Sequence, residues 1–425
     1  MEKIKNLIIG AGISGLGASH ALKQRGETSI VLERENTYGG LCGNFEINGF
    51  RFDRFVHLSF AQKEKCATEI FEKSCPDARV LQSNPFNIYK GKWIKHPAQN
   101  NLYPLSEEEK KLVIEDFMKR PSLTEENKPK NYEEWLRLQF GNYFAEHFPM
   151  AYTRKYWMKE ARDLRTEWTG GRFYQPSVDE VIEGSKTPDT PTTYYSKEML
   201  YPAKGGFKSF LKDLAEEADI RANTTATRIN VIKKTVFIND TEDGYNYDRL
   251  ISSMPLPEII KIIDDVPEEV KSAAAKLEAT HGYHVSIALK GNNIPPYLWW
   301  YIYDEDNLSA RVHSPSLKSP DNVPEGCSSL QMEVYCEKEE YTEEELLKRT
   351  VGQLVKIGAI NQEDILFTHL GYEQYANVIF SEPIYEAREI VKKYLETVGI
   401  ETIGRFGQWE YFWTDQALKN GLSIK

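Results

Sequence analysis

Three glycines near the start of the chain have the spacing of a site for nucleotide phosphates. Gly10, Gly12 and Gly15 form the pattern GxGxxG, which follows a short apolar run and opens a predicted helix. Because glycine has no side chain, the backbone at these positions lets a pyrophosphate approach the N-terminus of the helix. Glu33 ends the next predicted strand, where a carboxylate accepts hydrogen bonds from ribose hydroxyls. The four residues together predict a dinucleotide site in a βαβ unit.

A glycine pair further along the chain indicates which dinucleotide is bound. Gly39, Gly40 and Leu41 follow shortly after the second predicted strand. The ordered segments GAGISGLG, IVLERE and YGGLCG resemble the extended fingerprint of the glutathione-reductase and amine-oxidase class of flavoproteins. This resemblance implies that the cofactor is FAD rather than NAD.

Composition narrows the class of protein further. The chain has 53 basic and 64 acidic side chains, and its net charge of −11 gives no general attraction to nucleic acid or to an anionic membrane. The five cysteines have neither CxxC spacing nor a histidine cluster beside them, which argues against a zinc site or a disulfide framework. Neither a membrane span nor a signal peptide is predicted, so we expect a cytoplasmic protein without a metal site.

The predicted elements set the glycine-rich site in a larger α/β architecture. Residues 169–200 are rich in Gly, Pro, Thr and Ser without a clean period, which predicts a long loop or lid. Hydrophobic periodicity elsewhere predicts the regular elements. The predicted helices cover 14–25, 62–75, much of 106–160, 207–217, 342–357, 385–397 and a short segment from 414. The predicted strands cover 5–10, 28–33 and segments within 86–95, 219–239, 249–253, 279–335 and 366–373.

This order predicts a Rossmann-type FAD-binding domain with an inserted helical domain and a mixed antiparallel-sheet substrate domain. The FAD-binding domain is discontinuous and is expected to comprise residues 1–60, 201–256 and 398–425. The helical substrate and lid domain is expected at 105–185, and the sheet-based substrate domain at 61–104, 186–200 and 257–397.

Along most of its length, the sequence resembles eukaryotic-type UDP-galactopyranose mutases. The resemblance implies that His57 lies beside the reactive ring of the flavin. It also implies that Arg172 and Arg311 bind a diphosphate, a role that suits a planar guanidinium because it donates two parallel hydrogen bonds. The matching segments occur in the family's order and are FRFDRFVHLSF, FGNYFAEHFPMAYTRKYW, EWTGGRFYQPS, YPAKGGFKSF, LISSMPL, the segment around Arg311, and GRFGQWEYFWTDQ.

Four residues in the last of these segments are further candidates for the site. The resemblance implies that Arg405 lies near the cofactor and Tyr411 near the sugar diphosphate. Asp415 and Gln416 open a predicted helix, whose N-terminus would stabilise negative charge on a reduced flavin.

The loop HPAQNN departs from the family at the expected base site. It keeps Gln99 and Asn100, but His96 and Ala98 stand where the family has aromatic rings. The loss of a stacking surface implies a different base or a different group in the same space. The candidates to fill that space are Trp299, Trp300 and Tyr303.

A second departure concerns the sugar. The family has a tyrosine shortly before the predicted helix at 385, whereas here Tyr375 is the nearest tyrosine and Asn377 occupies the matching position. Both residues are therefore candidate substrate ligands, and the sequence does not fix the sugar as galactose.

The resemblance implies a nucleotide-sugar mutase that interconverts pyranose and furanose forms through an adduct between the sugar and reduced flavin. NAD(P)H is a candidate reductant, a nucleotide-diphosphate sugar is the expected partner, and a homo-oligomer is compatible with the sequence. Cell-surface polysaccharide biosynthesis is the implied role. The first alternative is an FAD-dependent oxidase or desaturase of the amine oxidase or protoporphyrinogen oxidase type, which would need an apolar channel rather than two buried arginines. The second is a flavin-containing binding protein without turnover.

Overall fold

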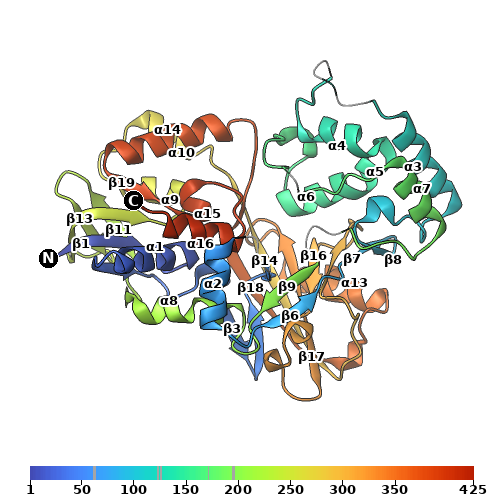
Figure 1. Ribbon diagram of the computed structural model, residues 1–425, viewed down its shortest axis with the longest axis horizontal. Helices are drawn as coiled ribbons and strands as arrows, with labels where there is room; N and C mark the ends of the chain where they lie inside the picture. Colours follow the sequence, from blue (N-terminus) through green and yellow to red (C-terminus); the bar gives the residue numbers. More distant parts are fainter. Residues whose placement is uncertain (61–63, 122–123, 125–126, 171, 194–196) are drawn as a thin grey trace.

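The computed structural model of the protein describes residues 1–60, 64–121, 124, 127–170, 172–193 and 197–425. Two seven-stranded sheets form the two halves of the molecule, and a group of helices lies above the second sheet (Figure 1). Both chain termini belong to the half built on the first sheet. Within the described ranges, no helix is both long enough and apolar enough to cross a membrane.

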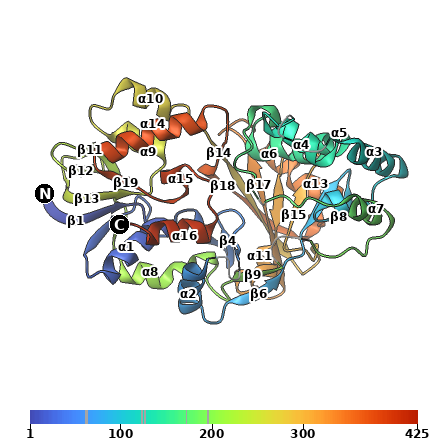
Figure 2. The same cartoon turned by 45° about the horizontal axis from the view of Figure 1, so that its top comes forward.

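The first sheet confirms the predicted Rossmann-type βαβ unit. β1 pairs in parallel with β2 and β13, and β10 and β19 extend this parallel region, whereas β11 and β12 are antiparallel. Helices cover both faces of the sheet (Figure 2), which explains the nearly continuous apolar run of β1. In sheet order the strands are β10 (Asp219–Arg221), β2 (Ser29–Leu32), β1 (Glu2–Ile9), β13 (Gly244–Ser252), β12 (Thr235–Ile238) and β11 (Ala226–Asn230), with β19 (Ile400–Thr402) beside β13.

The helices of this half bring the C-terminus back to the glycine-rich turn. α1 and α16 cross closely, because Gly17 and Gly421 have no side chains: a Cβ on Gly17 would lie 2.9 Å from Leu418 Cδ1, and one on Gly421 would overlap the backbone of Ser14. α1, α8 and α16 cover one face of the sheet, and α9, α10 and α14 cover the other (Figure 1). Their bounds are α1 Ile13–Gln24, α8 Lys212–Glu217, α9 Leu256–Ile262, α10 Glu268–Ala274, α14 Ile384–Thr397, α15 Gly404–Gln408 and α16 Thr414–Leu422.

Three of these helices pack differently from the grouping predicted for residues 257–397. α14 contacts β19 and α10, and α9 contacts β11, so all three pack with the first sheet rather than the second. The reason is that their apolar faces, which include Ile259, Val270 and Val391, share one buried cluster with Leu250 of β13.

The second sheet is mixed and mainly antiparallel. β15 and β7 are parallel, and the other neighbouring strands run antiparallel. Leu346, Val351 and Leu354 of the flanking helices α12 and α13 pack on the same cluster as its apolar side chains. In order the strands are β18 (Ile365–Val378), β14 (Ala279–Lys290), β17 (Cys327–Tyr335), β16 (Arg311–His313), β15 (Trp299–Ile302), β7 (Phe86–Tyr89) and β8 (Lys92–Lys95), and the helices are α12 (Glu343–Arg349) and α13 (Val351–Lys356).

Smaller elements join the two halves. Two short sheets, the helix α2 and the turn of helix α11 lie between the large sheets. They are β3 (Asn44–Ile47) with β4 (Phe50–Asp53), β5 (Ser59–Phe60) with β9 (Glu198–Tyr201) and β6 (Arg79–Gln82), α2 (Lys65–Ser74) and α11 (Pro315–Lys318).

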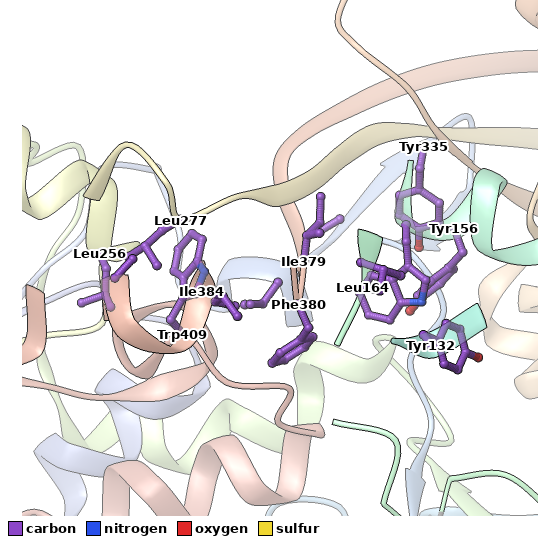
Figure 3. Close-up of a cluster of buried hydrophobic side chains, with 14 of the residues drawn as sticks. Tyr132, Tyr156, Leu164, Leu256, Leu277, Tyr335, Ile379, Phe380, Ile384 and Trp409 are labelled. Atoms are coloured by element: carbon purple, nitrogen blue, oxygen red, sulfur yellow. The ribbon is translucent and has the colours of Figure 1, made fainter. Parts of the chain in front are cut away.

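The predicted helical insertion is confirmed as a group of helices above the second sheet. Figure 3 shows part of the buried cluster that links it to the first half, from Leu256 and Trp409 through Phe380 to Tyr156 and Tyr132. The helices are α3 (Glu107–Lys119), α4 (Tyr132–Phe140), α5 (Asn142–Ala145), α6 (Ala151–Trp157) and α7 (Val178–Lys186).

The long loop predicted at 169–200 contains α7, so that prediction was wrong for this stretch. Ser177 caps α7 by accepting a hydrogen bond from the backbone of Glu180 at 3.2 Å, and Glu180 bonds back to Ser177. Gly184 packs so closely that a Cβ would overlap the carbonyl oxygen of Asn100. Residues 171 and 194–196 of the predicted lid lie outside the described residues.

Candidate functional site

The glycine-rich turn has the geometry that a pyrophosphate requires. Gly10 has φ +99°, and a Cβ there would overlap the Ser253 hydroxyl, while a Cβ on Gly15 would overlap the Gly10 carbonyl oxygen. A Cβ on Gly12 would meet no protein atom within 4 Å. The backbone at the start of α1 therefore faces open space, and the N–H groups there can bind an anion.

Glu33 is oriented by two backbone donors. Its carboxylate accepts hydrogen bonds from Ala11 N at 2.8 Å and from Glu35 N at 2.9 Å, and the residue is 7% exposed. Each oxygen keeps a further lone pair for a ribose hydroxyl. Gly39 donates from its N–H to the Ala11 carbonyl oxygen at 2.9 Å, and its φ of +123° together with Gly40's φ of +55° explains the glycine pair. These residues fit the ADP part of a dinucleotide.

A cavity of about 460 Å³ lies where the helical insertion, the second sheet and the C-terminal segment meet. Half of the residues that line it are Phe, Tyr or Trp. Ten residues predicted from the sequence line it together, and they are Leu41, His57, Gln99, Arg172, Trp299, Tyr303, Arg311, Asn377, Arg405 and Tyr411.

Arg172 crosses the cavity from the helical insertion to the C-terminal segment. Its Nη2 donates a hydrogen bond to the Tyr411 carbonyl oxygen at 2.7 Å. Its guanidinium carbon lies 4.2 Å from the centre of the Tyr411 ring and 4.3 Å from the centre of the Trp413 ring. Since no carboxylate of the described residues forms an ion pair with it, Arg172 brings an uncompensated positive charge to the cavity.

Arg311, by contrast, has a partner. Its Nε and Nη2 donate to the two oxygens of Glu333 at 2.9 and 3.0 Å, and the Glu333 side chain is 0% exposed. Burial alone would lower the pKa of Arg311, but the adjacent Glu333 carboxylate raises it well above its usual value. Glu333 also accepts hydrogen bonds from Val56 N at 2.9 Å and from the Tyr335 hydroxyl at 3.0 Å. The carboxylate thus fixes Arg311 relative to the loop that carries His57.

Asn377 is the centre of a hydrogen-bond network at the C-terminal wall. Its Oδ1 accepts from the Tyr156 hydroxyl at 3.2 Å and from Arg405 Nη1 at 3.5 Å, and the Tyr156 and Tyr411 hydroxyls lie 3.1 Å apart. Arg405 further donates to the Phe412 carbonyl oxygen at 2.9 Å. No described carboxylate forms an ion pair with Arg405, so a second positive charge is present at this wall.

His57 lies on the wall between the two halves of the molecule. Burial lowers the pKa of His57 to about 4, the negative charge of Asp53 acts in the opposite direction, and the positive charges of Lys318 and Arg405 lower it further. The imidazole is therefore neutral at pH 7, which fits a residue that packs beside a bound group rather than one that carries a charge.

The loop expected to hold the base is tied to the helical insertion. Gln99 Nε2 donates to the Tyr174 carbonyl oxygen at 2.8 Å. Asn100 is buried with its Nδ2 3.4 Å from the Thr193 hydroxyl and does not line the cavity. His96 Nδ1 lies 3.1 Å from Asn87 Oδ1, and burial lowers the pKa of His96 to about 3.

Besides Asn100, two predicted substrate ligands do not line the cavity. Trp300 is fully buried in the core of the second sheet, because alternation along β15 turns its neighbours Trp299 and Tyr301 to the cavity instead. Tyr375 donates its hydroxyl hydrogen bond to Glu258 at 2.6 Å and packs against other aromatic rings.

Asp415 and Gln416 lie at the start of the last helix, as expected. Gln416 Oε1 accepts a hydrogen bond from Trp413 N at 2.9 Å and so caps α16, while Asp415 is 3% exposed in its first turn. Neither lines the cavity, and the start of α16 lies next to Thr414, which does.

Much of the aromatic wall was not predicted as part of the site. Tyr152 and Tyr156 are four residues apart on α6 and therefore share a face, which was the available signal. Tyr335 comes from β17, and no local pattern distinguishes it from a core residue. The unpredicted aromatic residues of the lining include Tyr152, Tyr156, Trp157, Trp168, Tyr335 and Trp413.

A Rossmann-type sheet with a glycine-rich turn, joined to a second sheet across an aromatic cavity, defines a dinucleotide-dependent enzyme class. The profile of flavin containing amine oxidoreductases matches residues 13–388. The chain belongs to this family of flavin-dependent enzymes, and membership implies a flavin cofactor.

Similar proteins fall into two groups. Over 115 residues the chain is 29% identical to all-trans-retinol 13,14-reductase of Macaca fascicularis, and over 63 residues it is 39% identical to that of Rattus norvegicus. These matches cover 26% and 15% of this chain, and only 18% and 10% of the relatives.

Solved structures match over nearly the whole chain. Reduced UDP-galactopyranose mutase has a TM-score of 0.91 at 23% identity, covering 99% of this chain and 94% of that one. A protein described as protoporphyrinogen oxidase from Exiguobacterium sp. 255-15 has a TM-score of 0.77 at 16% identity, covering 100% and 98%. A putrescine oxidase variant has a TM-score of 0.66 at 14% identity, and the match covers 99% of this chain and 98% of that one. At these identities the likeness shows the fold.

Proposed function

We propose that the protein is an FAD-dependent nucleotide-sugar mutase that interconverts the pyranose and furanose forms of a sugar. The observation that carries the proposal is the uncompensated guanidinium of Arg172, held in a cavity that Arg311 also lines. The guanidinium is partly buried, so its charge is less well solvated than on the surface and favours a bound anion; a diphosphate carries the matching charge and geometry. The cytoplasm and NAD(P)H are the proposed location and source of electrons.

The residues of the chain have distinct tasks in this proposal. Gly10, Gly12, Gly15 and Glu33 hold the ADP part of the cofactor. Arg172 and Arg311 hold the diphosphate, including after it separates from the sugar, so that the two can recombine. When bound and reduced, the flavin supplies the nucleophile that replaces the diphosphate on the sugar.

The cavity wall has the remaining tasks. The hydroxyls of Tyr156 and Tyr411 can orient the diphosphate or the sugar, because each is already positioned by the other. The surrounding rings exclude water, which strengthens the interaction between guanidinium and phosphate. Neutral His57 contributes shape next to the flavin rather than a proton.

The test begins with an absorbance spectrum of the purified protein to establish bound flavin. The dithionite-reduced protein is then incubated anaerobically with a panel of UDP-, dTDP- and GDP-sugars, and the products are separated by chromatography. We expect an isomer of one nucleotide sugar without net oxidation of the flavin. Arg172→Ala should abolish its formation, whereas Arg137→Ala, which breaks a surface pair with Glu133 in the same group of helices, should not.

One observation favours the second candidate, an FAD-dependent oxidase or desaturase. Half of the residues that line the cavity are Phe, Tyr or Trp, as expected for an apolar substrate. Such an enzyme would have no use for the charge of Arg172, so Arg172→Ala would leave its turnover nearly unchanged. Bound flavin with no isomer across the whole panel of nucleotide sugars would support this candidate instead.

A further inference from the structure

Trp413 lines the cavity immediately before α16, and its ring lies against Arg172. The guanidinium carbon is 4.3 Å from the centre of this ring. The Trp413 ring is supported by Phe60, with 4.8 Å between ring centroids, and its backbone N–H donates to Gln416 Oε1 at 2.9 Å. The Trp413 ring thus packs on Phe60, another residue of the lining, and its backbone is held at the start of α16.

An aromatic ring holds a guanidinium without using its hydrogen-bond donors. The attraction is between the cation and the electron-rich face of the ring, so the N–H groups in the guanidinium plane stay available. To the part of the chain that the structure describes, Arg172 donates one hydrogen bond, which the Tyr411 carbonyl oxygen accepts. A carboxylate would position an arginine too, but it would take up donors and cancel the charge, as Glu333 does for Arg311.

Arg172 and Arg311 are thus fixed by opposite means. Arg311 is fixed by an acid and is largely neutralised, whereas Arg172 is fixed by the rings of Tyr411 and Trp413 and keeps its full charge. The second arrangement is suited to an anion that must be bound and released.

We propose that Trp413 is a positioning residue that holds the Arg172 guanidinium, through its ring face, in the orientation that binds the diphosphate of the substrate. This inference rests on the proposed function, because it assigns Arg172 a diphosphate ligand. It adds a residue that acts through Arg172.

The test uses the flavin-loaded, oxidised protein and inorganic pyrophosphate, a probe that does not depend on the identity of the base or sugar. Affinity is measured by calorimetry for wild type, Trp413→Phe, Trp413→Leu, Arg172→Gln and the double variant Trp413→Leu with Arg172→Gln. We expect Trp413→Leu to weaken binding about 5- to 30-fold, the range for a partly desolvated cation and ring pair. Trp413→Phe, which keeps a ring, should weaken it less.

The double variant separates positioning from packing. If Trp413 acts through Arg172, Trp413→Leu causes no further loss when Arg172 is already Gln. An equal loss in both backgrounds would overturn the proposal, as would wild-type affinity in Trp413→Leu. If Arg172→Gln itself binds pyrophosphate like wild type, it is the proposed diphosphate site that fails rather than the role of Trp413 alone.

A second measurement avoids any effect on folding. Fluorinated tryptophans placed at position 413 alone weaken the electron density of the ring face while nearly keeping its shape. Pyrophosphate affinity should fall stepwise with the number of fluorine atoms. A constant affinity along this series would overturn the proposal even if Trp413→Leu failed to retain flavin.

Discussion

Glu333 and Arg311 form a two-bond ion pair in the cavity wall, and the carboxylate of that pair has no exposure to solvent. The same carboxylate accepts a hydrogen bond from the backbone N–H of Val56, one residue before His57. Through Glu333, the second sheet therefore sets the position of both the arginine and the loop expected to face the flavin. This link makes the pair important for stability as well as for binding.

Replacing Arg311 by Met should destabilise the protein strongly, because Glu333 would remain buried without its charge partner. We expect a loss of about 3–5 kcal/mol in the free energy of unfolding at pH 7, measured by chemical denaturation of the flavin-loaded protein. Arg154→Met, which breaks pairs with exposed Glu305 and Glu160, should cost about 1 kcal/mol or less. Similar losses for the two variants would contradict this account.

Gly12→Ala should separate flavin binding from folding. A Cβ at this position meets no protein atom within 4 Å, so the protein without flavin should keep its melting temperature. The added methyl group would stand where the pyrophosphate approaches the start of α1. We therefore expect at least about 10-fold weaker flavin binding, measured by flavin absorbance during reconstitution. A fall in melting temperature without a fall in flavin content would refute the assignment.

Gly184→Ala should disturb the attachment of α7 to the loop at 98–101. A Cβ there overlaps the Asn100 carbonyl oxygen, so either the helix or the loop must move. We expect a loss of about 2 kcal/mol or more in the free energy of unfolding. Gly352→Ala in α13 is the control, since its Cβ would lie 3.8 Å from the nearest atom and alanine favours helix. Unfolding in urea compares the two, and equal stability would show that α7 is loosely packed.

Acid should weaken the protein partly through His57. Because burial lowers the pKa of His57 to about 4, the unfolded chain binds a proton here near pH 6.5, whereas the folded chain does so only near pH 4. In this window the unfolded state binds more protons, so stability falls as pH falls from about 6.5 to about 4. His57→Gln should lessen that fall by up to about 3 kcal/mol. Denaturation curves of both proteins at pH 7 and pH 4.5 measure the free energy of unfolding. If the difference between the two pH values is the same in His57→Gln as in wild type, the imidazole of His57 is not held neutral by the fold.

The cofactor end of the molecule was predictable because its signals are local. Gly10, Gly12 and Gly15 are needed within one turn between a strand and a helix, and Glu33 ends the adjacent strand. Short-range geometry fixes what these residue types do there, so the pattern of the sequence carries the structural information. The capping box of α7 was an equally local signal, and the Gly- and Pro-rich composition around it concealed the helix.

The substrate end was predictable only in part. Arg172, Arg311 and Tyr411 converge on one cavity although they come from three distant segments, and the resemblance to mutases anticipated this. Trp300 is a residue for which the prediction from sequence failed. Both it and Trp299 are aromatic residues of the same strand, and the packing of α12 and α13 on one side of the sheet decided which of the two faces the cavity.

The sequence by itself determined the βαβ unit, the flavin fingerprint and the residue types available for binding an anion. The tertiary structure decided that Arg311 is neutralised by Glu333 while Arg172 keeps its charge between aromatic rings. It also decided that Tyr375 bonds Glu258 while Asn377 joins the cavity wall. The physical reason is that strand and helix signals act over a few residues, whereas the charge and orientation of a side chain in a cavity depend on partners contributed by distant segments.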